Sequence, residues 1–163
     1  MPEVASHTVL LGSIGGDAHS VGLTILRSAL TRQGYHVLYL GTQTPLRDFF
    51  AMAVLADVVM ISSMDGHAKY YLKEFPELMR EHRAHRPRWY LGGNLTIGDA
   101  MGVEKYYLDM GFDRVWAKFA DIRTVLTVLE RDVEGSEPVA HAPSTWERLR
   151  PKGAIDRAPT SDA

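Results

Sequence analysis

The residues best suited to chemistry in this sequence are a carboxylate and an imidazole, Asp17 and His19, on a segment flanked by glycines. A histidine with an acid beside it suits a metal ligand, because the acid can accept a hydrogen bond from the ring nitrogen that does not bind the metal. The segment follows the first apolar stretch and precedes the first helical pattern. Open α/β sheets bind ligands at such places, at the carboxyl ends of their strands. Taken alone, His19 is equally a histidine of a capping loop, with Asp17 as the capping acid.

Two later segments also place polar residues or glycines after apolar stretches. The first begins at residue 62 and the second at residue 92, and together they comprise Ser62, Ser63, Met64, Gly92, Gly93, Asn94, Leu95, Thr96, Ile97 and Gly98. In a doubly wound sheet whose strands are ordered 2-1-3-4-5, strands one, three and four are neighbours. We therefore expect these two segments to meet the segment of His19 on one rim of the sheet.

Apolar stretches alternate with helix-period patterns between residues 8 and 133. They predict strands at 8–12, 36–40, 57–62, 89–91 and 113–116, and helices at 20–33, 45–56, 69–85, 102–110 and 121–133. Pro76 is expected to kink or restart the third helix, and Asp121 to cap the last one. Five βα units in series predict an α/β, flavodoxin-like fold, in which a doubly wound five-stranded parallel sheet has the order 2-1-3-4-5.

Three of the helices carry an apolar stripe that is expected to face the sheet. The stripe residues are Val21, Ile25, Leu26, Ala29 and Leu30 in the first helix, Leu46, Phe49, Phe50, Ala53 and Val54 in the second, and Ile122, Val125, Leu126, Leu129 and Val133 in the last. The third strand contains four consecutive apolar residues from Val58 onward, which is typical of a central strand covered on both faces.

The composition indicates a single cytoplasmic globular domain. The chain has 163 residues, of which 45% are hydrophobic and 23% charged, with a formal net charge of −2. The absence of a basic stripe argues against a nucleic-acid partner, and no stretch suggests a secretion signal or a membrane span. Because there is no cysteine, neither a thiolate metal site nor a cysteine nucleophile is possible.

The alternating pattern stops near residue 134. Residues 134–163 hold four of the eight prolines and few large apolar side chains. We therefore expect a domain of residues 1–133 followed by a mostly disordered tail of residues 134–163. Trp146 and Leu149 are exceptions, and either could dock on the domain or on a partner.

The three segments together resemble the cobalamin-binding domain of B12-dependent mutases and methionine synthase. That family carries Asp-x-His-x-x-Gly, then Ser-x-Leu, then Gly-Gly, and the matching residues here are Asp17, His19, Gly22, Ser62, Met64, Gly92 and Gly93. The spacing agrees as well, with 39 residues between Gly22 and Ser62 and 27 between Met64 and Gly92. Residues 11–17, 92–94 and 110–115 also look like the small subunits of glutamate mutase (methylaspartate mutase). The resemblance covers about residues 5–133.

The resemblance implies that the chain binds adenosylcobalamin base-off, with the nucleotide base of the cofactor displaced from cobalt. It implies His19 as the lower axial cobalt ligand oriented by Asp17, Ser62 as a hydroxyl donor to the displaced base, and Gly22 as the position that leaves room for the nucleotide tail. The cofactor-binding residues it implies are Gly16, Asp17, Ala18, His19, Ser20, Gly22, Ser62, Ser63, Met64, Gly92, Gly93, Asn94, Leu95, Thr96, Ile97 and Gly98.

The function implied is that of the small component of a carbon-skeleton mutase, which interconverts L-glutamate and 3-methylaspartate by radical rearrangement. In that family a separate, large barrel-type subunit holds the small acid substrate, so this chain is expected to have no catalytic residue of its own and to be inactive alone. Two departures from the pattern bear on the substrate and the partner. Met64 replaces the usual leucine, and the segment 65–68, with Asp65 and His67, stands where the family usually has a tyrosine.

Other functions remain as alternatives. The chain could be a stand-alone cobalamin carrier or sensor, a corrinoid methyl-transfer module, or a mutase component that acts on a different acid. The DNA-binding region usual in a sensor and the N-terminal helical cap usual in a methyl carrier are not visible. A phospho-receiver domain needs an aspartate where Ser62 stands, and a nicotinamide-binding loop needs glycines at a spacing that Gly12, Gly15 and Gly16 do not have.

Two further groups of residues are explained more simply by structure than by chemistry. His82 and His85 lie three residues apart among arginines, and we interpret them as part of a solvated helix face rather than as metal ligands. We interpret Tyr70, Tyr71, Tyr106 and Tyr107 as packing residues, with contacts to a partner as the alternative.

Overall fold

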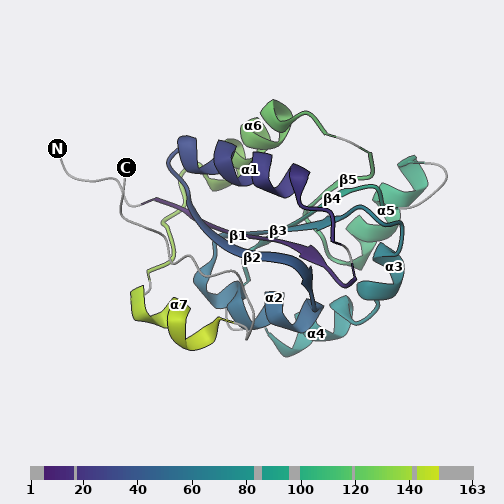
Figure 1. The fold of residues 1–163 in the computed structure, drawn as a ribbon, viewed down its shortest axis with the longest axis horizontal. Helices are drawn as coiled ribbons and strands as arrows, with labels where there is room; N and C mark the ends of the chain where they lie inside the picture. The colour runs from purple at the N-terminus through teal and green to yellow at the C-terminus, as the bar shows by residue number, and fades with distance from the viewer. Residues whose placement is uncertain are drawn as a thin grey trace.

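The computed structural model describes residues 6–16, 18–82, 86–95, 100–118, 120–140 and 143–150. Among the residues singled out above, Asp17, Thr96, Ile97, Gly98 and His85 lie outside these ranges. The described residues form a parallel sheet with helices on both of its faces (Figure 1). None of the helices in these ranges is long and apolar enough to cross a membrane.

The sheet has five parallel strands in the order β2-β1-β3-β4-β5, which confirms the predicted topology. The strands are β1 (Thr8–Ile14), β2 (His36–Thr44), β3 (Val58–Ser63), β4 (Arg88–Gly93) and β5 (Arg114–Trp116). Ser62 of β3 lies in register with Ser13 of β1 and with Gly92 of β4. The segments that follow β1, β3 and β4 therefore leave the sheet side by side on one rim.

Two helices cover one face of the sheet, and the others lie on the opposite face or at its side (Figure 1). The first face carries α1 (Val21–Arg32) and α6 (Ile122–Val133), and the second carries α2 (Leu46–Met52), the 3-10 turn η1 (Ala53–Leu55), α4 (Phe75–Glu81) and α7 (Pro143–Leu149). The short α3 (Ala68–Tyr71) and α5 (Ala100–Met110) add Ala68 and Tyr107 to the core of the second face.

Local signals in the sequence account for where several helices begin. The helical stretch predicted at 69–85 is divided into α3 and α4, and Pro76 occupies the first turn of α4, so the proline restarts the helix. Asp121 caps α6 as predicted, because its carboxylate accepts a hydrogen bond of 3.0 Å from the backbone N–H of Arg123.

The core is divided into two clusters by the sheet, because successive strand residues point to opposite faces. Leu10, Val59 and Leu91 face α2, α4 and α7, whereas Val9, Met60 and Tyr90 face α1 and α6. Most of the side chains that α2 and α6 add to these two clusters belong to their predicted stripes. The prediction that stripe residues are buried is wrong for two residues of the first predicted helix and one of the second. Val21, Ile25 and Val54 are 72%, 51% and 48% exposed.

The tail expected after residue 133 contains a docked helix. The side chain of Trp146, in α7, is fully buried in the core beside α2, and Leu149 packs against the same cluster. The chain reaches this place along the amino-terminal edge of the sheet, where the Asp57 carboxylate accepts 2.7 Å and 3.0 Å hydrogen bonds from the backbone N–H groups of Thr8 and Val139. The expectation of disorder therefore does not hold for α7, because the burial of one large indole stabilises its packing on the domain.

Candidate functional site

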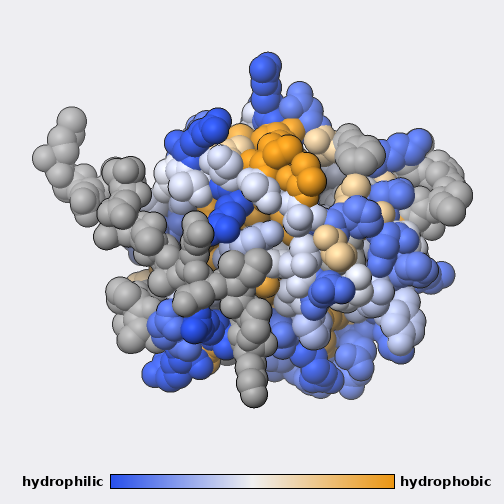
Figure 2. Space-filling view, in the orientation of Figure 1, coloured by the Kyte–Doolittle hydropathy of each residue, from blue (hydrophilic) through white to orange (hydrophobic). Residues whose placement is uncertain are grey.

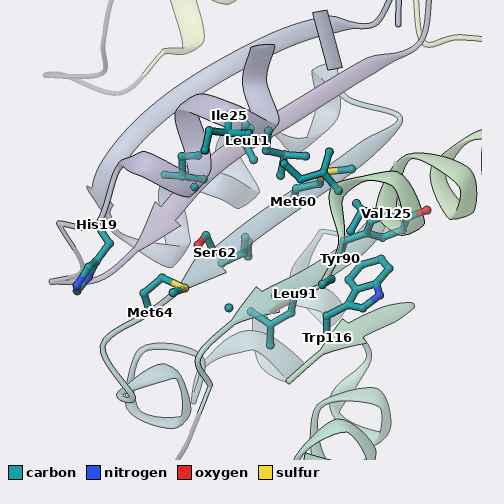
Figure 3. Close-up of a pocket in the computed structure, with 18 of the residues that line it drawn as sticks. Leu11, His19, Ile25, Met60, Ser62, Met64, Tyr90, Leu91, Trp116 and Val125 are labelled. Atoms are coloured by element: carbon teal, nitrogen blue, oxygen red, sulfur yellow. The ribbon is translucent and has the colours of Figure 1, made fainter. Parts of the chain in front are cut away.

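A groove of about 510 Å³ opens on the α1 and α6 face of the sheet, at the rim where the segments after β1, β3 and β4 converge (Figure 3). It is bounded by the first turns of α1, the strand ends and the start of α6. Seven of the residues predicted from the sequence line it, and these are His19, Ser20, Gly22, Ser62, Met64, Gly92 and Gly93. Gly16, Ala18, Ser63, Asn94 and Leu95 are not among its lining residues.

Most of the groove wall is apolar, and the sequence motifs described above do not include these apolar residues. The additional lining residues are Leu11, Val21, Leu23, Ile25, Leu26, Met60, Ile61, Tyr90, Leu91, Trp116, Ala120, Ile122 and Val125. The exposure of Val21 and Ile25 explains why the predicted stripe of α1 was only partly right, since its first half faces the groove rather than packed core. Figure 2 shows the resulting apolar patch over α1. Such uncovered apolar surface is typical of a binding site.

Gly22 leaves open space on the groove side of α1. A Cβ atom built at this position would meet no atom within 4 Å. Glycine in a helix is less favourable than alanine by about 0.5–1 kcal/mol, and the packing of the chain gives no reason for it here. The position is therefore better explained by an occupant of the groove than by the fold.

Gly92 and Gly93 differ in what they do. A Cβ atom at Gly93 would lie 2.3 Å from the carbonyl oxygen of Ser63, and its φ is 123°, so glycine is required for the close approach of β3 and β4. A Cβ atom at Gly92 would make only an ordinary contact, 3.9 Å from Cβ of Trp116. Of the two glycines, Gly93 is thus explained by the fold itself.

Aromatic rings form the end of the groove opposite His19 (Figure 3). Tyr90 and Trp116 pack edge to face with ring centroids 5.4 Å apart. The Tyr90 hydroxyl donates to the carboxylate of Asp132 in α6, and Arg114 binds the same carboxylate through Nε at 3.1 Å and Nη2 at 2.8 Å. The hydrogen bond from Arg114 lowers the pKa of Asp132, and burial raises the pKa of Tyr90. The tyrosine therefore stays neutral with its hydroxyl committed to α6.

His19 stands at the mouth of the groove, near Met64 (Figure 3). Its side chain is exposed. The carbonyl of the next residue, Ser20, begins α1 by accepting 2.9 Å hydrogen bonds from the backbone N–H and the hydroxyl of Thr24. Among the described residues no group of three or more His, Cys, Asp or Glu side chains could hold a metal ion.

His82, the other histidine interpreted above, takes part in packing. Its Nδ1 lies 2.9 Å from the carbonyl oxygen of Leu78, and its ring centroid lies 5.2 Å from that of Phe50. These contacts give it a structural role on α4, apart from the groove.

Comparison with known proteins places the chain in a family. Residues 7–122 match the family model described as the B12 binding domain. This chain belongs to the B12-binding domain family. The matched residues include β1 to β5 and the three segments that meet at the rim.

Several relatives of this B12-binding domain are similar over most of their length. Glutamate mutase sigma subunit 1 of Haloarcula marismortui is 36% identical over 131 residues, which cover 78% of this chain and 86% of the relative. The glutamate mutase sigma subunit of Clostridium tetani is 36% identical over 114 residues, covering 68% and 83%. That of Clostridium cochlearium is 33% identical over 130 residues, covering 77% and 95%.

Two solved structures share the fold. A cobalamin-binding protein from Desulfitobacterium hafniense DCB-2 superposes with a TM-score of 0.61 at 18% identity over 77% of this chain. The methanol:cobalamin methyltransferase complex of Methanosarcina barkeri gives a TM-score of 0.61 at 19% identity over 90% of this chain. The matches span only 58% and 52% of those two chains, so the shared fold is one part of each.

Proposed function

We propose that this chain is the cobalamin-binding small component of an adenosylcobalamin-dependent carbon-skeleton mutase resembling glutamate mutase. The observation that carries the proposal is the groove at the rim, which has a histidine at its mouth, a hydroxyl within it and aromatic rings at its far end. Membership of the B12-binding domain family supports the cofactor, and relatives named as glutamate mutase sigma subunits support the reaction.

The chemistry of the groove fits a corrinoid bound base-off. Its apolar wall suits a planar aromatic base, and the open space at Gly22 gives room for a nucleotide tail to pass along α1. Ser62 supplies a hydroxyl that can donate to a base nitrogen.

In this proposal His19 is the lower axial ligand of cobalt, and Asp17 accepts a hydrogen bond from its other ring nitrogen. That hydrogen bond would fix the tautomer of the imidazole and raise its basicity. Adenosylcobalamin supplies, when bound, a cobalt–carbon bond that breaks homolytically. The residues of this chain bind the cofactor, orient it and keep water from the buried base.

The substrate is proposed to bind on a second chain. Among the described residues, those that line the groove include no lysine, arginine, aspartate or glutamate, so nothing here suits recognition of a small dicarboxylic acid. A large barrel-type subunit in a heteromeric assembly would hold the substrate above the corrin, and this chain alone would be inactive. The relatives' names, which call them subunits, support such an assembly. We further propose a cytoplasmic location.

A second candidate keeps the cofactor and changes the acid. The loop after β3 carries Asp65 and His67. The backbone N–H of His67 donates a 2.9 Å hydrogen bond to the Asp65 carboxylate, and Nδ1 of the His67 ring lies 3.6 Å from the same carboxylate. The His67 side chain is exposed. An acid and a second histidine at this place favour contacts with a partner or substrate other than those of glutamate mutase. Assays of the reconstituted assembly with L-glutamate and with other small acids would separate the two.

The test of cobalt ligation is a substitution of His19 by alanine in the full chain. We expect cobalamin affinity to fall by at least about 100-fold with the fold retained, because the bond to cobalt is lost. Titration followed by absorbance gives the affinity. Electron spin resonance of bound cob(II)alamin, with 15N-labelled histidine in the protein, reports whether a protein nitrogen coordinates cobalt. The matched control is His36→Ala, because the exposed His36 begins β2 and does not line the groove. Unchanged affinity and hyperfine pattern in His19→Ala would contradict the proposal.

A further inference from the structure

The loop that carries His19 rests on one aromatic side chain, Tyr71, from α3. A Cβ atom at Gly15 would lie 2.2 Å from Cδ1 of Tyr71, and one at Gly16 would lie 2.7 Å from its hydroxyl oxygen. The ring therefore occupies the space that side chains at these two positions would fill. Gly15, whose φ is 65°, is required for this close approach, whereas at Gly16 it is the terminal hydroxyl of Tyr71 that lies close.

The same loop is fixed from its other side by β2. The backbone N–H of Gly15 donates a 2.9 Å hydrogen bond to the carbonyl oxygen of Thr44, and Gly15 has a φ of 65°. The start of the loop thus has two supports, one from the end of a strand and one from the Tyr71 ring. The loop then continues to His19, which stands at the mouth of the groove.

Tyr71 is itself held in place by its neighbours. It packs against the core of the α2 and α4 face, and its backbone N–H donates a 3.2 Å hydrogen bond to the carbonyl oxygen of His67. The rings of Tyr70 and His67 meet it edge on, with centroids 5.5 Å and 6.4 Å away. The segment after β3, in which the sequence departs from its family's usual pattern, therefore supports the loop after β1.

We propose that Tyr71 is a positioning residue for His19. Its ring holds the Gly15–Gly16 start of the loop against β2 and thereby sets where the imidazole stands over the groove. Residues that ligate a metal from a loop need such support, because a displacement of about 0.5 Å is enough to impair a site. This inference rests on the proposed ligation of cobalt by His19. The sequence led us to interpret Tyr71 only as a packing residue, and the two glycines it contacts give it this further role.

The test replaces Tyr71 by leucine in the full chain, which keeps an apolar side chain but removes the planar ring. We expect cobalamin affinity to fall on the order of 10-fold, the effect typical of residues that orient a metal ligand. We also expect the 15N-histidine hyperfine signature to appear in a smaller fraction of the bound cob(II)alamin. Tyr71→Phe keeps the ring and should restore both values to within about 2-fold of the original chain.

The matched control is Tyr106→Leu, which removes the ring of an exposed tyrosine on α5. Tyr106 is 43% exposed and is not among the side chains described above as contacting Gly15, Gly16 or Tyr71, so we expect its loss to leave affinity and signature unchanged. Full affinity and full signature in Tyr71→Leu would overturn the inference. A lower affinity with the full 15N-histidine hyperfine signature would also overturn it, because Tyr71 would then act on the groove and not on His19. A His19→Ala variant that keeps both values would instead refute the proposed ligation itself.

A second pair of variants tests the contact from the loop side, including the case in which Tyr71→Leu fails to fold. Gly16→Ala places a methyl group 2.7 Å from the Tyr71 hydroxyl oxygen, and the next ring atom, Cζ, is 3.7 Å away. We therefore expect Gly16→Ala to weaken cobalamin binding in the original chain and to have a smaller effect when combined with Tyr71→Phe. Equal effects of Gly16→Ala in both backgrounds would show that the two residues are not coupled and would overturn the inference.

Discussion

On the sheet face covered by α2, α4 and α7, large aromatic side chains fill the space between the layers. Phe75 stacks on Phe112 with centroids 4.1 Å apart, and Trp89 packs between Phe50 and Phe75 at 4.5 Å and 5.2 Å. On the face covered by α1 and α6, a groove of about 510 Å³ remains beside the first turns of α1.

The difference indicates that one face stabilises the fold and that the other provides the binding surface. Dense aromatic packing stabilises the fold from one side, which allows the other side to leave apolar surface uncovered. Val21 and Ile25 are the residues left exposed on that open side. Substitutions on the packed face, away from Tyr71 and the loop that it contacts, should therefore change stability and leave cobalamin binding alone, whereas substitutions of residues that line the groove should change cobalamin binding more than stability.

The largest effect on stability is expected from Trp146→Ala on the packed face. This indole is fully buried in the core beside α2, and deletion of such a side chain costs about 3–5 kcal/mol. Urea unfolding measures the change, and cobalamin titration of the folded protein should give the original affinity. Val54→Ala, at a 48% exposed position next to the same core, is the control and should change stability by less than about 0.5 kcal/mol. A loss below about 1 kcal/mol for Trp146→Ala would mean that α7 does not stabilise the domain.

A smaller effect is expected from Asp132→Asn, which acts on the open face. Polar contacts join α6 to the sheet there, because the Asp132 carboxylate binds both Arg114 and Tyr90. Replacement by the neutral amide should cost about 1–3 kcal/mol at pH 7. The pKa of Asp132 is lowered in the folded chain, so its contribution is present above the ordinary carboxyl pKa of about 4 and is lost as the pH falls through the lowered value.

Unfolding curves of the original chain and Asp132→Asn should therefore differ at pH 7 and converge as the pH falls through the lowered pKa of Asp132. Asp109→Asn is the matched control, because Asp109 forms a 2.6 Å ion pair with Lys105 that is open to solvent on α5. Exposed pairs of this kind contribute little to stability, so this variant should resemble the original chain at both pH values. A constant difference between Asp132→Asn and the original chain across the whole pH range would contradict an ionic role for Asp132.

The sequence predicted the strands and helices that position the site better than the side chains that line it. The order of the strands, the restart at Pro76, the cap at Asp121 and the meeting of three segments on one rim all follow from local patterns and from rules of connection. The stripe of α1 was predicted to be buried, since periodicity shows that a helix face is apolar but not what covers it. The structure shows that Val21 and Ile25 of that stripe face the groove.

Other features depend on contacts between residues far apart in the chain. Met60, Tyr90 and Trp116 reach the groove because three parallel strands are in register, and each residue alone is a normal apolar strand residue. Trp146 was recognised as an exception in its segment, but only the packing against α2 decides that it docks on the domain. The support of the His19 loop by Tyr71 could not be read from the sequence either, because it depends on the path of the loop after β1.

The smallest effect on stability is expected from Gly22→Ala. This variant should also give the sharpest contrast between stability and cobalamin affinity. A methyl group here meets no protein atom within 4 Å, so the variant should gain up to about 0.5 kcal/mol from a better helix former in the first turn of α1. The same methyl group projects into the groove, so cobalamin affinity should fall. Gly102→Ala provides the control, because Gly102 is an exposed glycine near the start of α5 that does not line the groove, and it should gain stability without losing affinity. Opposite signs for stability and affinity at position 22 would mean that this glycine serves the ligand, whereas a gain in stability with unchanged affinity would mean that the nucleotide tail does not pass along α1.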